Sequence, residues 1–279
     1  MNFGVITLPN VGWEELVRRW RYLDEVGVET LWVADHLASY RRPEQTWFEG
    51  WTCLATMAAV TERARIGPLV SPITLRNPAV LAKAAVTVDH ASGGRLELAI
   101  GAGGSEPDQT LAAGRPWSAA ERSRRLRDFV ERLVELLASQ QLQPPPVQPR
   151  LPLTIAGQAD GTLRLAAVHA DRWNTYVGEG LEPDEAVQIT RERNELLTRA
   201  CEEIGRDPTH VRRSVLIGYP FVGETPWRSE AALRDVVERW AAIGVEELVF
   251  YYPAELAMPE GSVEPGLFER AFREILPGI

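Results

Sequence analysis

Short runs rich in β-branched residues alternate with longer amphipathic runs along the whole chain, and this alternation restricts the fold more than any other feature. The first unit pairs a strand expected at residues 3–8 with a helix expected at 13–26, where apolar residues recur every three or four positions. Seven more units follow, which gives eight expected strands and eight expected helices. Strict alternation of this kind indicates parallel strands that are joined by crossover helices.

Eight such units favour closure into a (β/α)₈ barrel, an α/β fold that typically needs about 250 residues. We expect a single domain over residues 1–279, in which the Pro- and Gln-rich residues 140–152 form an extended connector. The expected strands cover residues 3–8, 30–34, 64–71, 95–100, 151–156, 172–176, 211–217 and 246–252. The expected helices cover residues 13–26, 51–60, 78–91, 118–138, 161–169, 183–204, 229–243 and 264–276. The strand residues expected to form the barrel core include Val5, Leu31, Val33, Ile66, Leu98, Ile100, Ile155, Trp173, Leu216 and Val249.

Composition and charge exclude several classes of function. The net charge is −9 and the sequence has no basic run, which argues against a nucleic-acid partner. No apolar run approaches the roughly 18 residues that a membrane span requires. The first residues lack the basic head of a signal peptide, so we expect a cytoplasmic protein without a membrane partner. Cys53 and Cys201 are expected to be buried free thiols, and the four histidines lack ligand spacing, so no metal is expected.

The active site of a parallel barrel forms at the C-terminal ends of its strands, so polar residues just after each expected strand are the candidates. The candidates are Thr7, Asn10, Asp35, His36, Ser71, Thr74, Glu106, Gln158, Asn174, Tyr219, Tyr251 and Tyr252. The loops expected at residues 39–50 and 103–117 border this barrel mouth, but their sequences do not name a substrate.

Asp35 and His36 form the sharpest pair among these candidates. Histidine titrates near neutrality, so His36 at the active end of a strand can give or take a proton. The adjacent aspartate can orient a ligand or raise the basicity of the histidine. The alternative is a histidine that caps a loop and binds nothing.

Glu106 ends the glycine-rich run Gly101–Glu106. The glycines allow the backbone to approach a flat ring or a phosphate closely. The carboxylate could serve as a general acid or as a hydrogen-bond acceptor, or it could be solvated in a flexible turn.

Two further features suit a ring-shaped, phosphorylated ligand. Residues 156–162 link an expected strand to its helix, and the free N–H groups of a helix start can bind an anion, although a simple turn explains the segment equally well. Four tryptophans in or beside loops could form an aromatic wall, and loop packing accounts for at least two of them. They are Trp47, Trp51, Trp117 and Trp227.

Several segments together resemble the luciferase-like monooxygenases, a superfamily that includes bacterial luciferase, alkanesulfonate monooxygenase and the F420-dependent reductases and dehydrogenases. The first segment reads Leu-Trp-Val-Ala-Asp-His-Leu at residues 31–37. The others are residues 63–83, which are the most specific, and residues 89–98, 101–103, 151–157, 163–167 and 170–174.

The resemblance implies a (β/α)₈ barrel whose mouth holds the ring of reduced FMN or of coenzyme F420. It implies a non-proline cis peptide near Pro68, Leu69 and Val70, and a phosphate near Ala156, Gly157 and Gln158. His36 and Glu106 would be the catalytic residues. The residues expected to bind the cofactor are Asp35, Pro68, Leu69, Val70, Ser71, Gly103, Ala156, Gly157, Gln158 and Asn174.

The expected partners are a small-molecule substrate, a flavin or F420 reductase and a second copy of the chain. The chain lacks the long insertions of the luciferases, which argues against light emission and a long aldehyde substrate. The segment Gly103–Glu106 lacks the aromatic residue that many members carry there. Two other functions stay open: a non-redox lyase or hydrolase that uses His36 and Glu106 as acid and base, and a non-catalytic barrel that binds flavin.

Overall fold

The computed structural model describes residues 1–279 except 40–41, 43, 141, 177–179, 218–224 and 258–260. The strands are β1 (Asn2–Thr7), β2 (Thr30–Val33), β3 (Arg65–Pro68), β4 (Ser71–Pro72), β5 (Leu98–Gly101), β6 (Leu153–Ala156), β7 (Arg172–Thr175), β8 (Arg212–Leu216) and β9 (Glu247–Tyr252). The α-helices are α1 (Trp13–Val26), α2 (Gly50–Val60), α3 (Pro78–Ala91), α4 (Glu106–Ala113), α5 (Ala119–Ala138), α6 (Asp160–His169), α7 (Pro183–Glu203), α8 (Glu230–Ala241) and α9 (Leu267–Arg270).

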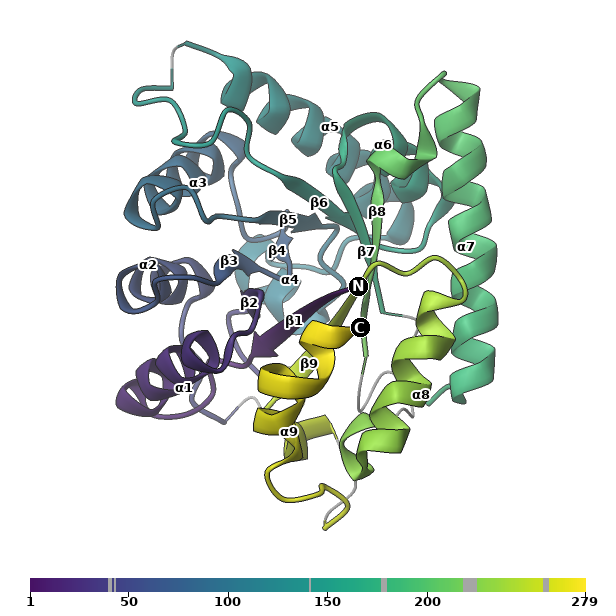
Figure 1. Cartoon of the computed structure of the whole chain (residues 1–279). Coiled ribbons are helices and arrows are strands. Elements are labelled where there is room, and N and C mark those ends of the chain that lie inside the picture. Colours follow the sequence, from purple (N-terminus) through teal and green to yellow (C-terminus); the bar gives the residue numbers. More distant parts are fainter. Residues whose placement is uncertain (40–41, 43, 141, 177–179, 218–224, 258–260) are drawn as a thin grey trace.

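All strands are parallel and form one sheet in the order β3-β2-β1-β9-β8-β7-β6-β5-β4. A bridge between Ile66 of β3 and Leu96, two residues before β5, joins the two ends of this order. The sheet is therefore a nearly closed barrel. Figure 1 shows the helices in a ring around the strands, with both termini at the near end and α4 behind the strands.

The strand expected at residues 64–71 is two segments, so the sheet formed by the described residues has nine strand segments instead of eight. The break lies at the non-proline cis peptide Leu69–Val70. Before the break, Pro68 of β3 pairs with Val33 of β2. After the break, Ser71 of β4 pairs with β5 on the other side. The split thus arises because the chain leaves one neighbouring strand and joins the other.

Two expected helical boundaries were also wrong. The segment 103–117 was expected to be a loop, but it contains α4, which Ser105 caps and Gly114 ends with a φ of 73°. The final helix was expected over residues 264–276, but α9 ends at Arg270 and continues as a π-helical turn, Ala271–Ile275, and a 3₁₀ turn, Leu276–Gly278. Both segments are short and irregular, and periodicity over a long window describes such segments poorly.

The expected core residues are all buried, but most of them face the helices and not the barrel interior. Val5, Leu31 and Trp173 are among the eight that pack in the large cluster under the helices, and only Leu216 and Val249 belong to the inner cluster. The inner cluster consists of Ile6, Trp32, Ala34, Leu69, Ala99, Leu216, Val249 and Tyr251. A period of two shows which strand residues share a face, but it does not show which face points inward.

Trp32 fills the middle of the barrel because two inward-facing positions are glycine. A Cβ atom on Gly4 would lie 2.8 Å from Nε1 of Trp32, and a Cβ atom on Gly67 would lie 2.7 Å from its Cζ3. Neither glycine has a positive φ, so the need is for space and not for an unusual backbone conformation. The interior therefore depends on these two small residues.

The N-terminal end of the barrel is filled by buried charges. Arg172 lies 3.2 Å from Glu97 and 3.3 Å from Glu247, and all three side chains are 3% exposed. The guanidinium also lies 5.7 Å from the ring of Trp32. Burial raises the pKa of Glu247, against the attraction of Arg172. This packing leaves the C-terminal end as the place for a ligand.

Other expectations concern thiols and membranes. Cys53 and Cys201 are buried and free, as predicted, and burial raises the pKa of Cys53 to about 12. In the described part of the chain, no helix combines the length and the apolar character needed to cross a bilayer.

Candidate functional site

His36 and Asp108 contact each other at the C-terminal end of the barrel. His36 lies in the segment after β2, and Asp108 lies in the segment after β5. Nδ1 of His36 lies 2.5 Å from Oδ2 of Asp108. The amide of Leu37 donates to Oδ1 of Asp108 over 2.9 Å. The side chain of Asp108 is 2% exposed, whereas that of His36 is 38% exposed. The imidazole of His36 is thus held by Asp108 at Nδ1 and is partly exposed to solvent.

Asp108 reaches this place because α4 begins directly after β5. The hydroxyl of Ser105 accepts a hydrogen bond from the Asp108 amide at 3.3 Å, which fixes the first turn of the helix. Burial alone would raise the pKa of Asp108. Hydrogen bonds with His36, Leu37 and Ser105 hold the pKa of Asp108 below its ordinary value. The carboxyl group is therefore ionised at neutral pH.

Sequence reasoning missed Asp108 and chose Glu106 in the same segment. Glu106 is the first residue of α4, and its side chain is exposed and has no partner among the described residues. The missed signal is the spacing Ser105-x-x-Asp108, a helix-capping pattern that places an acidic residue in the first turn. That pattern predicts a short helix after β5, with Asp108 on it.

Asp35 belongs to a different network from His36, although the two are adjacent. Its carboxylate accepts hydrogen bonds from Ser71 at 2.9 Å and from Nε of Arg76 at 3.1 Å. Ser71 in turn accepts from the indole N–H of Trp51 at 2.6 Å. Arg76 also lies 2.5 Å from Glu49. Both Asp35 and Ser71, expected to bind a cofactor, therefore have their polar atoms engaged within the protein.

This network holds the strand end that carries His36. Burial would lower the pKa of Arg76, but the carboxylates of Asp35 and Glu49 outweigh burial and raise it. Glu49 caps the start of α2, and Arg76 lies just before α3. The ion pairs therefore fix the segments that lead into these two helices to the end of β2. The interactions thus immobilise the backbone on which His36 stands.

The cis peptide predicted near residues 68–70 is confirmed as Leu69–Val70. The Leu69 amide donates to the carbonyl of Val33 at 2.9 Å, and the side chain of Leu69 belongs to the inner cluster. A Cβ atom on Gly101 would lie 2.5 Å from Cγ2 of Val70. On the same side, a Cβ atom on Gly103 would lie 2.6 Å from Oγ1 of Thr74. Glycine at these two positions thus lets the post-β5 chain lie against the cis-peptide segment.

The segment expected to bind phosphate lies between β6 and α6. Gly157 has a φ of 138° and its amide donates to the carbonyl of Asn174 at 3.1 Å. Ala159, the residue at the cap of α6, provides no side-chain hydrogen bond to the first turn. Gln158 donates to the carbonyl of Tyr176. In the first turn of α6, the amides of Thr162 and Leu163 donate to the carbonyl of Ala159. The amides of Asp160 and Gly161 are left for another acceptor, whereas the Asn174 side chain donates to Ser214 at 2.9 Å.

Several buried donors near the mouth have no partner among the described residues. They are Nε1 of Trp47, Oγ1 of Thr74 and Nε2 of Gln109. The ring of Trp47 also packs at 6.0 Å from the ring of His36, with an interplanar angle of 69°. Buried polar groups are usually hydrogen-bonded, so these donors are available to a ligand that carries acceptor atoms.

The other candidates lie elsewhere. Thr7 accepts from the indole of Trp20 on α1 at 3.0 Å, so it faces the helices. Tyr252 packs 5.0 Å from Phe268, again outside the barrel. Of the four loop tryptophans, Trp51 bonds to Ser71, Trp117 lies against Arg125, and Trp227 is buried in the outer core. Tyr219 lies outside the described residues.

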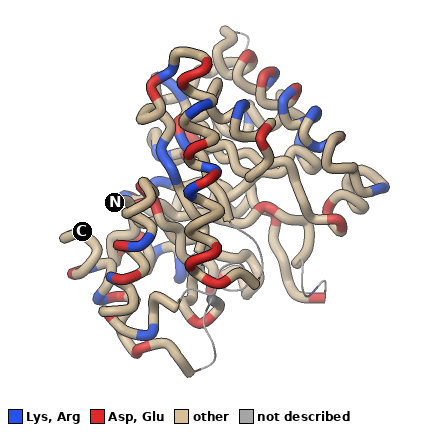
Figure 2. The backbone as a smooth tube through the Cα atoms, turned by 90° about the vertical axis from the view of Figure 1, so that its right-hand side faces the viewer, with Lys and Arg blue, Asp and Glu red and all other residues tan. Residues whose placement is uncertain are grey.

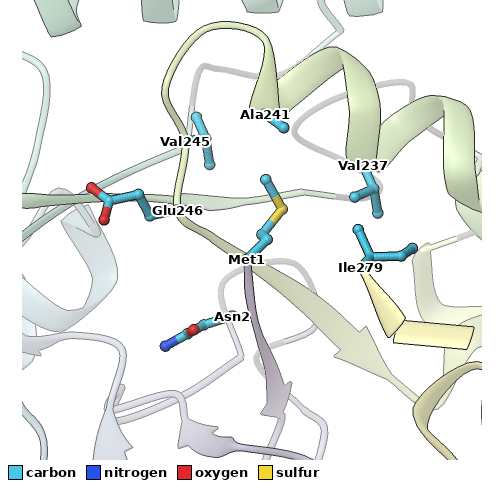
Figure 3. A pocket seen from close by; sticks show the side chains of 7 residues that line it. All are labelled: Met1, Asn2, Val237, Ala241, Val245, Glu246 and Ile279. Carbon is cyan, nitrogen blue, oxygen red and sulfur yellow. The ribbon is translucent and has the colours of Figure 1, made fainter. Parts of the chain in front are cut away.

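A hollow of about 340 Å³ lies beside the N-terminal end of β1 (Figure 3), whereas His36 follows the C-terminal end of β2. Its lining comes from the start of β1, the segment before β9 and the C-terminal Ile279, and Met1 points into it. Neither His36 nor Asp108 lines this space, so it has no part in the site. The described residues also contain no cluster of three His, Cys, Asp or Glu residues that could hold a metal ion.

The sequence of the chain is similar to that of known proteins. The family model described as luciferase-like monooxygenase matches residues 1–268. The chain is 29% identical over 203 residues to the F420-dependent glucose-6-phosphate dehydrogenase of Amycolatopsis mediterranei (strain U-32). This alignment covers 66% of this chain and 60% of that relative. It is 29% identical over 177 residues to the pyrimidine monooxygenase RutA of Cronobacter sakazakii (strain ATCC BAA-894). That alignment covers 57% of this chain and 50% of the relative. The chain thus spans less than two thirds of these curated relatives.

Solved structures share the barrel over nearly the full chain. An F420-dependent secondary alcohol dehydrogenase in complex with an F420-acetone adduct superposes with a TM-score of 0.79 at 16% identity, covering 99% of this chain and 98% of that chain. The long-chain alkane monooxygenase LadA superposes with a TM-score of 0.74 at 13% identity, covering 100% of this chain and 90% of that chain. At such identities, the likeness shows a common fold.

Proposed function

The chain belongs to the luciferase-like monooxygenase family, and from that premise we propose that it is a flavin- or F420-dependent oxidoreductase that acts on a small organic substrate. The observation that carries the proposal is the half-exposed imidazole of His36 at the barrel mouth, anchored by Asp108 and flanked by Trp47. A positioned imidazole can take a proton from a reacting group or return it. In this proposal, Nε2 of His36 is the atom that takes up the proton from the reacting group and returns it.

The residues at the mouth fit F420 or FMN. Unpartnered N–H and O–H donors such as Nε1 of Trp47 and Oγ1 of Thr74 suit the carbonyl and nitrogen acceptors of a tricyclic ring. Ala156, Gly157 and Gln158 precede the open first turn of α6, which suits a phosphate. When bound, such a cofactor supplies hydride transfer or oxygen activation.

We assign the remaining expected site residues by position. Pro68, Leu69 and Val70 would support the ring, and Gly103 would allow the chain after β5 to approach it. Asp35, Ser71 and Asn174 would act through the hydrogen bonds that hold these segments. Glu106 would reach the mouth as a second acid only if its exposed side chain turned inward.

The proposal extends to the architecture and the compartment. We count β3 and β4 as one interrupted strand of an eight-stranded barrel, and residues 1–279 as one domain. We place the enzyme in the cytoplasm together with a flavin or F420 reductase. The buried free thiols Cys53 and Cys201 support a reducing compartment.

The first test is titration of the purified protein with reduced FMN and with F420, followed by fluorescence or calorimetry. We expect saturable binding of at least one of them, because the mouth offers donors for a ring and an open helix start for a phosphate. Binding of F420 alone would indicate hydride transfer and would direct the substrate search to alcohols, imines and unsaturated carbonyls. Binding of reduced FMN alone would indicate a two-component monooxygenase.

The same titration separates the two rival functions. If neither cofactor binds, the redox proposal is wrong and a lyase or hydrolase based on His36 is favoured. If flavin binds but external donors cannot reduce it, the barrel holds the cofactor without turning it over.

We propose further that two copies of the chain associate through the faces of α2 and α3. These helices border a groove of about 670 Å³ whose described lining is apolar or hydroxylic except for Lys83, and Val80 is 67% exposed beside it. By contrast, acidic and basic residues alternate along the helices on the α7–α8 side (Figure 2). A large exposed apolar patch usually marks an interaction surface. A second copy would offer the same mainly apolar face in return.

We expect a dimeric mass at micromolar concentration, and we expect Val80→Glu to shift it to a monomer because the new carboxylates would lose their hydration in a mainly apolar contact. Sedimentation or light scattering measures the mass. The matched control is Val168→Glu on α6, where the valine is 51% exposed. A monomeric wild type, or equal effects of the two variants, would contradict association through this face.

A further inference from the structure

We propose that Asp108 is a positioning residue that fixes neutral His36 as the Nδ1–H tautomer and leaves Nε2 free at the barrel mouth. The role of Nε2 in turnover rests on the proposed function, but the tautomer itself does not. Nothing in the sequence pattern assigned this role to Asp108, because the contact joins residues that are 72 positions apart.

The hydrogen-bonding roles follow from the two oxygens of Asp108. Oδ1 accepts the Leu37 amide, a donor that cannot reverse its role. Oδ2 lies 2.5 Å from Nδ1 of His36, so the carboxylate and the ring nitrogen share a short hydrogen bond. An ionised carboxylate only accepts hydrogen bonds, so the proton in this contact belongs to the imidazole. A neutral imidazole that carries its proton on Nδ1 has its lone pair on Nε2.

The surroundings of Asp108 keep it ionised and in place. Its side chain is almost fully buried and sits in the first turn of α4, where the positive end of the helix dipole stabilises a negative charge. Ser105 fixes the same turn, and the Leu37 amide ties Asp108 to the loop that carries His36. Asp108 is therefore held both by the first turn of α4 and by the loop that carries His36.

Other charged groups near His36 do not compete for its Nδ1. Asp35 directly precedes His36, but its carboxylate is engaged by Ser71 and Arg76. Glu106 on α4 is exposed. Trp47, which packs against the imidazole, does not titrate and offers a donor only. Asp108 is thus the group that decides the orientation of the ring.

Asp108→Asn tests the role with little change of shape. In this variant, the oxygen of the new side-chain amide can still accept the Leu37 amide and keep the loop anchored. The NH₂ group of the new side chain then faces Nδ1 of His36 and can only donate, which forces the proton of the neutral ring to Nε2. An aspartate-to-asparagine change in the triad of serine proteases has this effect on its histidine, at a cost of about 10⁴ in kcat, as the best-known worked case.

The measurement is ¹⁵N NMR of the imidazole nitrogens in the full chain, at a pH where the ring is neutral. The His36 signals are those that disappear in His36→Gln. We expect Nδ1–H in the wild type and Nε2–H in Asp108→Asn, with a turnover loss of about 10²–10⁴-fold for the variant. The matched control is Asp128→Asn, the same chemical change at an exposed position of α5, which should leave the tautomer unchanged.

Each outcome decides between the two ideas. Nε2–H in the wild type would overturn the positioning role, and this result needs no variant to fold. An unchanged tautomer in a folded Asp108→Asn variant would overturn it too. A switch of the tautomer without loss of turnover would support the positioning role and would show instead that His36 is not part of the proposed reaction.

Discussion

Replacing His36 with alanine is expected to lower kcat by about 10²–10⁴-fold while the chain still folds, the usual range for loss of a general acid or base. The imidazole is the titratable group that is both exposed at the mouth and held by a buried partner, Asp108. Its removal leaves Asp108 with the Leu37 amide as a donor, so the loop keeps one of its anchors. The measurement is turnover with the cofactor that binds in the titration, over a panel of alcohols, imines and unsaturated carbonyls.

Two further variants sharpen this test. His36→Gln keeps a donor that can reach Asp108 but cannot carry a proton at neutral pH, so it should be as inactive as the alanine variant. His210→Ala removes an exposed histidine at the N-terminal end of β8 and should keep wild-type turnover. A His36→Ala enzyme with unchanged kcat would remove this residue from the mechanism.

Gly67→Ala is expected to destabilise the barrel by about 3 kcal/mol, at the upper end of the usual range for overpacking. The added Cβ would lie 2.2 Å from the backbone oxygen of Glu97 and 2.7 Å from the ring of Trp32. The amide of Glu97 donates to Ile66 at 2.8 Å in the bridge that closes the barrel, so this backbone cannot move aside without opening the closure. A loss of that size lowers the melting temperature by roughly 6–12 °C.

Gly4→Ala is the variant to compare with Gly67→Ala, because the Cβ atom added at Gly4 would contact the side chain of Trp32 and no backbone atom. The nearest atoms are Nε1 and Cδ1 of Trp32, at 2.8 and 3.1 Å. In a double-mutant cycle, Trp32→Phe should therefore relieve Gly4→Ala far more than Gly67→Ala. Gly104→Ala serves as the neutral control, because nothing lies within 4 Å of its added Cβ. Equal stability of Gly67→Ala and Gly104→Ala would contradict this account of the closure.

Periodicity over long helices was sufficient to predict their existence and often their ends. The helix at Pro78–Ala91 has the predicted bounds, because Asn77 caps it and Pro78 suits the first turn. The family resemblance also predicted the position of the cis peptide, which lies at Leu69–Val70. These features depend on residues that are close together in the chain.

The partner of His36 could not be predicted in the same way. Adjacency in the sequence suggested Asp35, but successive residues at a strand end point in different directions, and Asp35 is paired with Arg76. The position of Glu106 after a glycine-rich run suggested a general acid at the mouth, but a short helix carries Asp108 to the histidine and leaves Glu106 exposed. The choice between these carboxylates depends on where α4 sits above the closed barrel.

By itself, the sequence determined the order of parallel strands and helices, the set of buried strand positions and the end of the barrel where polar residues gather. Periodicity carries this information, because each element must bury one face. Tertiary structure alone decided which face of each strand points inward, which neighbouring strand each side of the Leu69–Val70 break joins, and which acid meets His36. These outcomes depend on closure of the sheet, which brings together residues such as Ile66 and Leu96, or His36 and Asp108, that no local pattern relates.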